Sequence, residues 1–344
     1  MKGTVTAPAH GVILNGQIGA DQIGTPPTPP DHQERPPLIA IVGPTGVGKT
    51  AASIALGTRF PAEIINADSR SFYRGMDIGT AKPDRAARSQ VPHHLVDILE
   101  PDEPMSLATF QDLTYACIDE IHTRCRIPLL VGGTPQYVNA VVEGWSIPRV
   151  PPNEPFRQEL ERVVEADGVG ELQARLRAVD PIAADAIGPN PRRIIRALEV
   201  FEATGQPITA LQTKQPVPFR TLEFELHAPR EILYDRIDAR VDDQIAQGLV
   251  AEVEALLARG ISPRASAFSS IGYRQVVPYL QGESSLDAAI ERIKFDSHRL
   301  VRQQQTWFRK NPRLIRIDTT EPAWLDRLIA QVDSFASNWR SSCE

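Results

Sequence analysis

The chain has 344 residues, 42% of them hydrophobic, and a formal net charge of −6. This composition supports a sizeable core of one or two domains and argues against a protein coated in nucleic acid. No stretch approaches the roughly 20 apolar residues that span a bilayer, and no secretory signal is evident, so we expect a cytoplasmic protein with no membrane partner. The three cysteines form no C-x-x-C pair, which fits a reducing compartment and argues against a disulfide framework or a zinc module.

The first ordered elements follow a polar, proline-rich segment. Residues 1–36 include PPTPP, and we expect them to form a disordered tail. At Leu38 the run LIAIV predicts a buried parallel strand, which leads through a glycine-rich turn into a helix from Lys49 to about Phe60. We expect three further elements: a strand over 62–68, a helix over 106–125 capped by Ser106, and a buried strand IPLLV. Strands that alternate with helices predict an α/β fold with a parallel sheet and flanking helices.

The pattern changes at the proline cluster IPRVPPNEP, near Pro148. Helical segments follow over 154–166, 168–179 and 192–204, without a convincing strand among them. A strand pattern returns in TLEFEL (221–226), a helical run extends from Arg230 to Arg259 and is ended by Gly260, and RLIRID (313–318) predicts a last strand. We therefore predict one α/β core, formed by residues 37–149 and 216–338, that is interrupted by a helical insertion over 150–215.

A phosphate-binding motif lies between the first strand and the first helix. GPTGVGKT (Gly43 to Thr50) matches G-x-x-x-x-G-K-[ST] in the required context. The glycines let backbone N–H groups approach phosphate oxygens, the helix N-terminus adds partial positive charge, Lys49 supplies a full charge, and the Thr50 hydroxyl can bind Mg²⁺. The motif predicts a P-loop-type core whose polyphosphate site is formed by Gly43, Pro44, Thr45, Gly46, Val47, Gly48, Lys49 and Thr50.

Two further polar residues, Asp68 and Thr134, follow predicted strands at the same sheet edge. Open parallel sheets bind ligands at the carboxyl ends of their strands, so both residues are expected in the crevice that holds the phosphate loop. Each has a structural alternative. Asp68 could cap the turn or helix that ADSRS starts, and Thr134 could cap a helix from Pro135 onward.

The strand that contains PLLV ends in Gly132-Gly133-Thr134, without a carboxylate. Motor ATPases and switch GTPases need an acid that positions the metal and a group that orients water. Hydrolysis that drives motion is therefore disfavoured, and group transfer remains, with Asp68 as the one well-placed base. A small-molecule kinase that uses ATP, and an NTP-regulated RNA-binding module without turnover, stay open as alternatives.

Positive charge is concentrated near the C-terminal end. From His298 to Arg316 the chain has no acidic residue and carries Arg299, Arg302, Arg309, Lys310, Arg313 and Arg316. This segment is either the solvated face of a helix or a surface that contacts phosphates.

Several longer motifs occur together and in a fixed order. They are NADSRSFYRGMDIGTAKP, PHHLVDILEP, PLLVGGT, PRRIIRALEV, TGQPIT, SIGYRQ and TWFR, and they extend over about residues 38–310. With them the chain resembles the tRNA dimethylallyltransferase family, also called tRNA isopentenyltransferases. It departs from the common pattern of that family at Ser71, Gln136 and Gln303, and after the Asn of GPNPRR.

The resemblance implies an enzyme with a defined reaction. Members of this family transfer a dimethylallyl group from dimethylallyl diphosphate to N6 of the adenine next to the anticodon of certain tRNAs. The phosphate loop would then hold the diphosphate of the prenyl donor, and Mg²⁺ and Lys49 would stabilise the departing pyrophosphate. The adenine has to leave the anticodon stack before N6 can reach an enclosed donor. We expect the protein to act as a monomer.

The resemblance also implies roles for individual residues. Asp68 would contact N6 and act as its base, and Thr134 would contact the reacting groups. Ser69, Arg70 and Ser71 would line the path of the flipped base, so that tRNA contacts are expected at Asp68, Ser69, Arg70, Ser71, Thr134, Arg157, Arg192, Arg193, Ile194, Ile195 and Arg196. The helical insertion is expected to grip the anticodon stem-loop.

Four aromatic residues lie in or near these motifs: Phe72, Tyr73, Trp307 and Phe308. Proteins that bind RNA loops stack splayed bases on aromatic rings. Single aromatics beside buried strands more often pack into the core, and the sequence leaves both roles open for each of the four.

Overall fold

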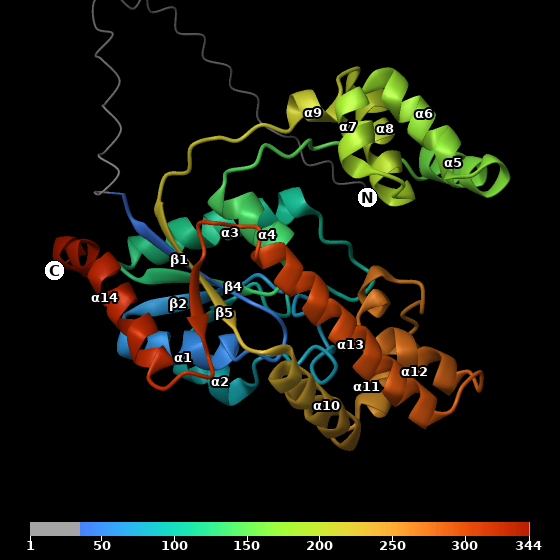
Figure 1. Ribbon diagram of the computed structural model, residues 1–344. Helices are drawn as coiled ribbons and strands as arrows, with labels where there is room; N and C mark the ends of the chain where they lie inside the picture. The colour runs from blue at the N-terminus through green and yellow to red at the C-terminus, as the bar shows by residue number, and fades with distance from the viewer. Residues whose placement is uncertain (1–34, 344) are drawn as a thin grey trace, which may run out of the picture.

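A computed structural model describes residues 35–343 of the chain, and its centre is a six-stranded parallel sheet (Figure 1). The strands are β1 (Pro37–Val42), β2 (Ala62–Asn66), β3 (His93–His94), β4 (Ile127–Gly132), β5 (Arg220–His227) and β6 (Ile315–Asp318). Their order across the sheet is β3-β2-β4-β1-β5-β6. The predicted α/β fold with a parallel sheet is confirmed, and the phosphate-loop strand β1 lies near the middle of the sheet, between β4 and β5.

Helices flank the sheet on both faces and form the insertion. They are α1 (Lys49–Arg59), α2 (Arg85–Gln90), α3 (Leu107–Thr123), α4 (Pro135–Val142), α5 (Glu154–Asp167), α6 (Val169–Val179), α7 (Pro181–Ile187), α8 (Pro191–Thr204), α9 (Ile208–Leu211), α10 (Arg230–Ala246), α11 (Leu249–Ala258), the 3₁₀ turn η1 (Ser266–Ser269), α12 (Tyr273–Leu280), α13 (Leu286–Phe308) and α14 (Trp324–Cys343). Among residues 35–343, no helix is both long and apolar enough to cross a membrane.

The two faces of the sheet bury separate hydrophobic clusters. Successive residues of β1 point to opposite faces, so Ile39 and Ile41 join the cluster with α1 and α10, whereas Leu38 and Ala40 join the cluster with α3 and α4. Every residue of β1 and β4 is buried. Burial on both faces explains why these strands read as continuous apolar runs in the sequence.

The segment between α4 and β5 forms a separate group of helices. Helices α5 to α9 enclose their own cluster, which includes Leu160, Leu172 and Val200. Figure 1 shows this group raised from the sheet and joined to it by two extended connections. An antiparallel bridge pairs Trp145 with Lys214 in these connections. The limits of the insertion at 150 and 215 stay a prediction.

Several expected boundaries were wrong. The long helical run is two helices, α10 and α11, because Gly248 adopts a left-handed conformation (φ 102°) between them. Strand β6 begins at Ile315, and local patterns did not predict the short elements α2, β3 and α7. Ser106 does cap α3, as predicted, by accepting a hydrogen bond from the Thr109 N–H.

Two further expectations concern the N-terminal segment and the cysteines. The predicted disordered tail lies outside the described residues except for Arg35 and Pro36, which belong to the fold. The Arg35 guanidinium donates to the Val217 carbonyl at 3.1 Å, and the Pro36 carbonyl accepts from the Arg220 N–H. Cys125 is disulfide-bonded, contrary to the expectation drawn from cysteine spacing.

Candidate functional site

A cavity of about 650 Å³ opens at the carboxyl ends of β1, β2 and β4. Lys49 of the phosphate loop, Asp68 after β2 and Thr134 after β4 all line it, together with residues of α10 and α13. The expectation that these three residues share one crevice is therefore met, because parallel strands present their carboxyl ends at the same edge.

The phosphate loop connects β1 to α1 as the motif predicts. At Gly43 the φ angle is 151°, and a Cβ there would lie 2.4 Å from the Leu226 carbonyl oxygen, so no side chain fits. Gly48 caps α1 without a side chain that could bond the first-turn N–H groups. These groups at the start of α1 stay available to an anion, which the helix dipole also favours.

Lys49 extends across the loop towards the cavity. Its ammonium donates to the carbonyls of Gly43 and Pro44, both at 2.9 Å. The pKa of Lys49 is lowered to about 8, chiefly because the ammonium is desolvated; the negative charge of Asp68 raises this pKa, and the positive charge of Arg240 lowers it further. A bound diphosphate would reverse the shift, since a nearby anion favours the protonated form.

Asp68 is held by short-range hydrogen bonds at the end of β2. Its N–H donates to Asn66 Oδ1 at 3.1 Å, and its own Oδ1 accepts the Arg70 N–H at 3.0 Å. The Asn66 side chain in turn donates to the Leu95 carbonyl. Asp68 thus caps a turn through Oδ1, as one of the two alternatives predicted. Its second carboxylate oxygen has no protein partner among the described residues, and the carboxylate lines the cavity.

Thr134 occupies the N-cap position of α4, yet its hydroxyl makes no capping bond. Thr134 Oγ1 instead accepts the Ser69 N–H at 3.4 Å, which joins the end of β4 to the end of β2. Thr134 therefore stands at the predicted N-cap position, but its side chain does not cap the helix. The hydroxyl hydrogen remains able to donate into the cavity.

The glycines before Thr134 explain why no acid stands there. A Cβ at Gly132 would lie 2.2 Å from the Ala67 carbonyl oxygen, and one at Gly133 would lie 2.7 Å from Gln304 Nε2 and 3.5 Å from Lys49 Nζ. A carboxylate has no room at either position without moving backbone or a bonded side chain. The site is thus built without the acid that NTP hydrolysis uses.

Two residues of the site were missed by sequence reasoning. Gln304 of α13 accepts the Thr45 N–H at 3.0 Å and donates to the Gly133 carbonyl at 2.7 Å, so it links the phosphate loop to the end of β4. Arg240 of α10 lines the cavity, where burial lowers its pKa. No local motif marks either residue, because each meets the loop through a contact about 200 residues or more along the chain.

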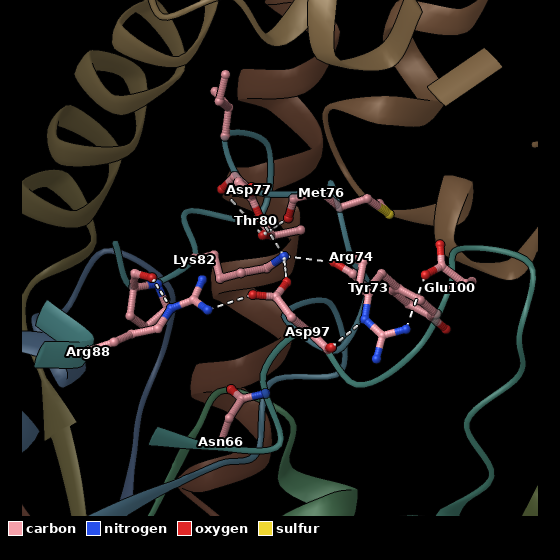
Figure 2. A network of polar contacts seen from close by, with 12 residues as sticks. Asn66, Tyr73, Arg74, Met76, Asp77, Thr80, Lys82, Arg88, Asp97 and Glu100 are labelled. Atoms are coloured by element: carbon pink, nitrogen blue, oxygen red, sulfur yellow. Dashed lines mark hydrogen bonds and ion pairs between the residues drawn. The ribbon is translucent and has the colours of Figure 1, made fainter. Parts of the chain in front are cut away.

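The far wall of the cavity includes the loop residues Gly79, Thr80 and Ala81. Two charged groups hold this loop. Figure 2 shows Lys82, whose buried ammonium donates to the Tyr73 carbonyl at 2.7 Å and to both Asp77 and Asp97 at 2.6 Å. On the other side, the Glu252 carboxylate of α11 accepts three successive backbone N–H groups, those of residues 77, 78 and 79.

The residues expected to contact tRNA lie in two places. Ser69 and Arg70 line the cavity, whereas Ser71 is buried and is not among the residues that line it. In the insertion, Arg192 and Arg193 are exposed at the start of α8. The side chains of the next two residues, Ile194 and Ile195, lie in the insertion core, and the tRNA contacts expected at these positions stay a prediction.

Two insertion arginines are engaged within the protein. Arg157 Nε donates to the buried carboxylate of Glu199 at 2.8 Å, and Arg196 pairs with the same carboxylate at 2.5 Å. The pKa of Glu199 is lowered to about 2; burial alone would raise it, but the hydrogen bonds from Arg157, the Asn153 N–H and Arg196 outweigh that effect. Both arginines remain about one third exposed, so part of each guanidinium reaches the surface.

Of the four aromatic candidates, only Trp307 is available to a base. Phe72, Tyr73 and Phe308 are buried in the two core clusters. Trp307 is 39% exposed and lines the cavity. Gln303, one position where the chain departs from the common family pattern, lines the same cavity, and Gln136 is exposed on α4.

Comparison with known proteins identifies the family. The sequence model described as IPP transferase matches residues 71–311. The chain belongs to the IPP transferase family. A protein of this family from Thermomicrobium roseum, named tRNA dimethylallyltransferase, is 49% identical over 301 residues, which are 87% of this chain and 92% of the relative. One with the same name from Chloroflexus aurantiacus is 52% identical over 288 residues, 83% of this chain and 97% of the relative.

Solved structures agree with this assignment. The tRNA isopentenylpyrophosphate transferase of Bacillus halodurans is 41% identical and superposes with a TM-score of 0.65, covering 89% of this chain and 97% of that one. A eukaryotic dimethylallyltransferase, described as acting on tRNA, is 26% identical with a TM-score of 0.73, covering 88% of this chain and 80% of that one. Family membership places the phosphate loop in a prenyltransferase rather than in a small-molecule kinase.

Proposed function

We propose that the protein transfers a dimethylallyl group from dimethylallyl diphosphate to N6 of the adenine next to the anticodon of tRNA, and releases diphosphate. The observation that carries this proposal is the position of the Asp68 carboxylate in the same 650 Å³ cavity as Thr45 and Lys49 of the phosphate loop. A base and the proposed diphosphate site thus face one cavity, and β4 ends at that cavity in Gly132-Gly133-Thr134, without a carboxylate.

The phosphate loop and two cations would stabilise the leaving group. An allylic carbon loses diphosphate with carbocation character, so the main requirement is a preorganised site for the negative charge that develops on the departing oxygens. The N–H groups at the start of α1, the ammonium of Lys49 and the guanidinium of Arg240 would meet that requirement.

Asp68 would position the adenine and take its proton. As the N6–C bond forms and the C–O bond to diphosphate breaks, N6 becomes cationic and loses one proton. The carboxylate oxygen of Asp68 that lacks a protein partner is the acceptor. A carboxylate is a weak base for a neutral amine and an adequate one for a cationic nitrogen, so this proton transfer occurs late in the step.

Magnesium is the cofactor that the donor chemistry calls for. Among residues 35–343, no three His, Cys, Asp or Glu side chains gather into a metal site. Mg²⁺ is commonly held by one or two protein oxygens together with substrate phosphates and water. The exposed Thr50 hydroxyl at the start of α1 makes no hydrogen bond among the described residues and fits that arrangement. Bound there with diphosphate, the ion would neutralise the leaving group.

The substrate RNA would be held by the insertion and by the rim of the cavity. Ser69, Arg70 and Thr134 are the proposed contacts around the flipped adenine, and Arg192 and Arg193 are the proposed phosphate contacts at the start of α8. Arg157 and Arg196 would add the exposed edges of their guanidinium groups. We further propose that the protein acts as a monomer in the cytoplasm, where its tRNA substrate occurs.

A diphosphate-release assay tests the proposed reaction. Purified protein, Mg²⁺ and dimethylallyl diphosphate are combined with an anticodon stem-loop RNA, and free diphosphate is measured. The proposal predicts release that depends on both the RNA and the adenine at the target position. ATP-dependent phosphorylation of a small molecule, without any diphosphate release from the prenyl donor, would favour a P-loop kinase instead.

A further inference from the structure

The exposed side of α13 forms a groove next to the reaction cavity. Phe295 is 54% exposed and Trp307 is 39% exposed, and both are among the few large hydrophobic side chains on the described surface. A second cavity extends between them. We call it the α13 groove, and its lining residues are Phe295, Arg299, Arg302, Gln303, Thr306, Trp307 and Lys310.

Helix α13 has a buried face and a solvent-exposed face, and the groove residues of the helix lie on the exposed face. The buried residues of α13 recur at three- and four-residue intervals and include Ile293, Val301 and Phe308. Phe295, Arg299 and Arg302 recur at the same intervals on the solvent side. Phe295 and Trp307 are twelve residues apart, which corresponds to about 18 Å along the helix axis.

The charge of the groove is positive and largely uncompensated. Arg299 and Lys310 form no ion pair among the described residues, and Arg302 donates to the hydroxyl of Tyr234 at 3.0 Å rather than to an acid. No acidic residue lies between Asp296 and Asp318 in the sequence. A surface that alternates cations with exposed aromatic rings matches a partner with negative charges and flat apolar groups, and single-stranded nucleic acid has both.

Phe295 is held in place by its neighbours. The guanidinium carbon of Arg292 lies 5.4 Å from the centre of the Phe295 ring. Arg292 Nε donates to the buried carboxylate of Asp296 at 3.2 Å, and that carboxylate also accepts hydrogen bonds from Arg274 and Gln275. Asp296 also lines the 650 Å³ cavity. Its carboxylate therefore orients Arg292, which contacts the Phe295 ring, and also forms part of the cavity wall.

We propose that the α13 groove binds the unpaired nucleotides that flank the target adenine, and that the Phe295 ring stacks with one of their bases. This inference rests on the proposed function. Arg299, Gln303 and Trp307 line both the groove and the reaction cavity, so an RNA whose one base enters the cavity continues along α13. At about 3.4 Å per stacked nucleotide, an 18 Å groove holds several.

Substitutions at Phe295 test the platform. Phe295→Leu keeps apolar bulk but removes the ring, and Phe295→Trp keeps a ring; at an exposed position neither change should perturb folding. Leu113→Ala, at an exposed apolar residue of α3, is the matched control. Affinity is measured by fluorescence anisotropy with an anticodon stem-loop RNA, and stacking by the emission of 2-aminopurine placed in turn at each unpaired position beside the target adenine.

Loss of one stacked base is expected to weaken binding about tenfold. Phe295→Leu should therefore raise the Kd for the RNA about tenfold, lower kcat/KM for the RNA by the same factor, and restore the 2-aminopurine emission at one flanking position. Phe295→Trp and Leu113→Ala should resemble the unchanged protein. The salt dependence of binding should not change in Phe295→Leu, because no phosphate contact is lost.

Two results would overturn the platform. They are an unchanged Kd in Phe295→Leu, and 2-aminopurine emission that does not respond to the substitution at any flanking position. Failure of the proposed function is a different result, since it requires that the unchanged protein itself leaves the RNA unmodified in the presence of Mg²⁺ and dimethylallyl diphosphate.

Discussion

Lys49 and Asp68 carry opposite charges into one cavity, and the charge of Asp68 favours the protonated form of Lys49. The Asp68 charge raises the pKa of Lys49 against the desolvation that lowers it. In the absence of a donor, this leaves the ammonium only partly protonated near pH 8. In the proposed reaction, the negative charge of bound diphosphate would restore the proton on Lys49, and Asp68 would be free to act on the adenine.

Removing the Asp68 charge should stop transfer without removing the RNA site. Asp68→Asn retains an oxygen that can accept the Arg70 N–H but cannot take the proton from N6. We expect turnover to fall at least about 100-fold, a typical contribution of general base catalysis. Single-turnover kinetics would measure this, and the Kd for RNA should change less than about threefold. Turnover close to that of the unchanged protein would exclude Asp68 as the base.

The pH dependence should report the Lys49 ammonium. Since its pKa is lowered to about 8 in the free protein, the charge that attracts diphosphate is present below pH 8 and is lost above it. We expect kcat/KM for dimethylallyl diphosphate to fall as the pH rises through about 8, and kcat to hold to higher pH because the bound donor raises the pKa. Lys49→Arg should lack this decline, since a guanidinium stays protonated. A flat profile in the unchanged protein would contradict the account.

At the scale of elements, the local pattern could predict β1, the phosphate loop and α1, because one continuous stretch specifies all three. The same is true of Ser106 at the start of α3. The pattern could not predict that α13 reaches the loop through Gln304, since that contact joins residues 259 positions apart. Arg196 and Glu199 lie one turn apart on α8, but the pattern could not reveal that Arg157, 42 residues away, meets the same carboxylate.

The loop at the far wall of the cavity offers a test at this scale. Glu252→Gln removes the charge that accepts the N–H groups of residues 77 to 79. Hydrogen bonds to a charged group contribute about 1.5–3 kcal/mol, so we expect a comparable loss of unfolding free energy and faster hydrogen exchange at these amides. Glu254→Gln, at an exposed position of the same helix, is the control. Exchange rates equal in both variants would show that Glu252 does not hold the loop.

The whole molecule combines an acidic net charge with local positive surfaces. A net charge of −6 gave no reason to expect an RNA partner. The exposed arginines at the start of α8 and the cations of α13 nevertheless form two separate basic regions, on the insertion and on the core. An RNA that contacts both would bridge the two parts of the chain, which Figure 1 shows joined by two extended connections.

Salt dependence tests the insertion contact. Each phosphate contact adds about 0.7 to the slope of log affinity against log salt for a single strand. The double substitution Arg192→Gln and Arg193→Gln should therefore lower the slope by about 1 to 1.5 and weaken binding at low salt. Arg162→Gln, at an exposed arginine of α5 in the same insertion, should leave the slope unchanged. An equal slope in the double variant would remove α8 from the interface.

The most direct measurement is mass spectrometry of nucleosides from an anticodon stem-loop RNA that has been incubated with the protein, Mg²⁺ and dimethylallyl diphosphate. The account predicts one adenosine, next to the anticodon, heavier by a single dimethylallyl group attached at N6, and no product with Asp68→Asn or with guanosine at that position. An RNA that emerges unmodified, or a prenyl group found on another nucleoside, would contradict the account.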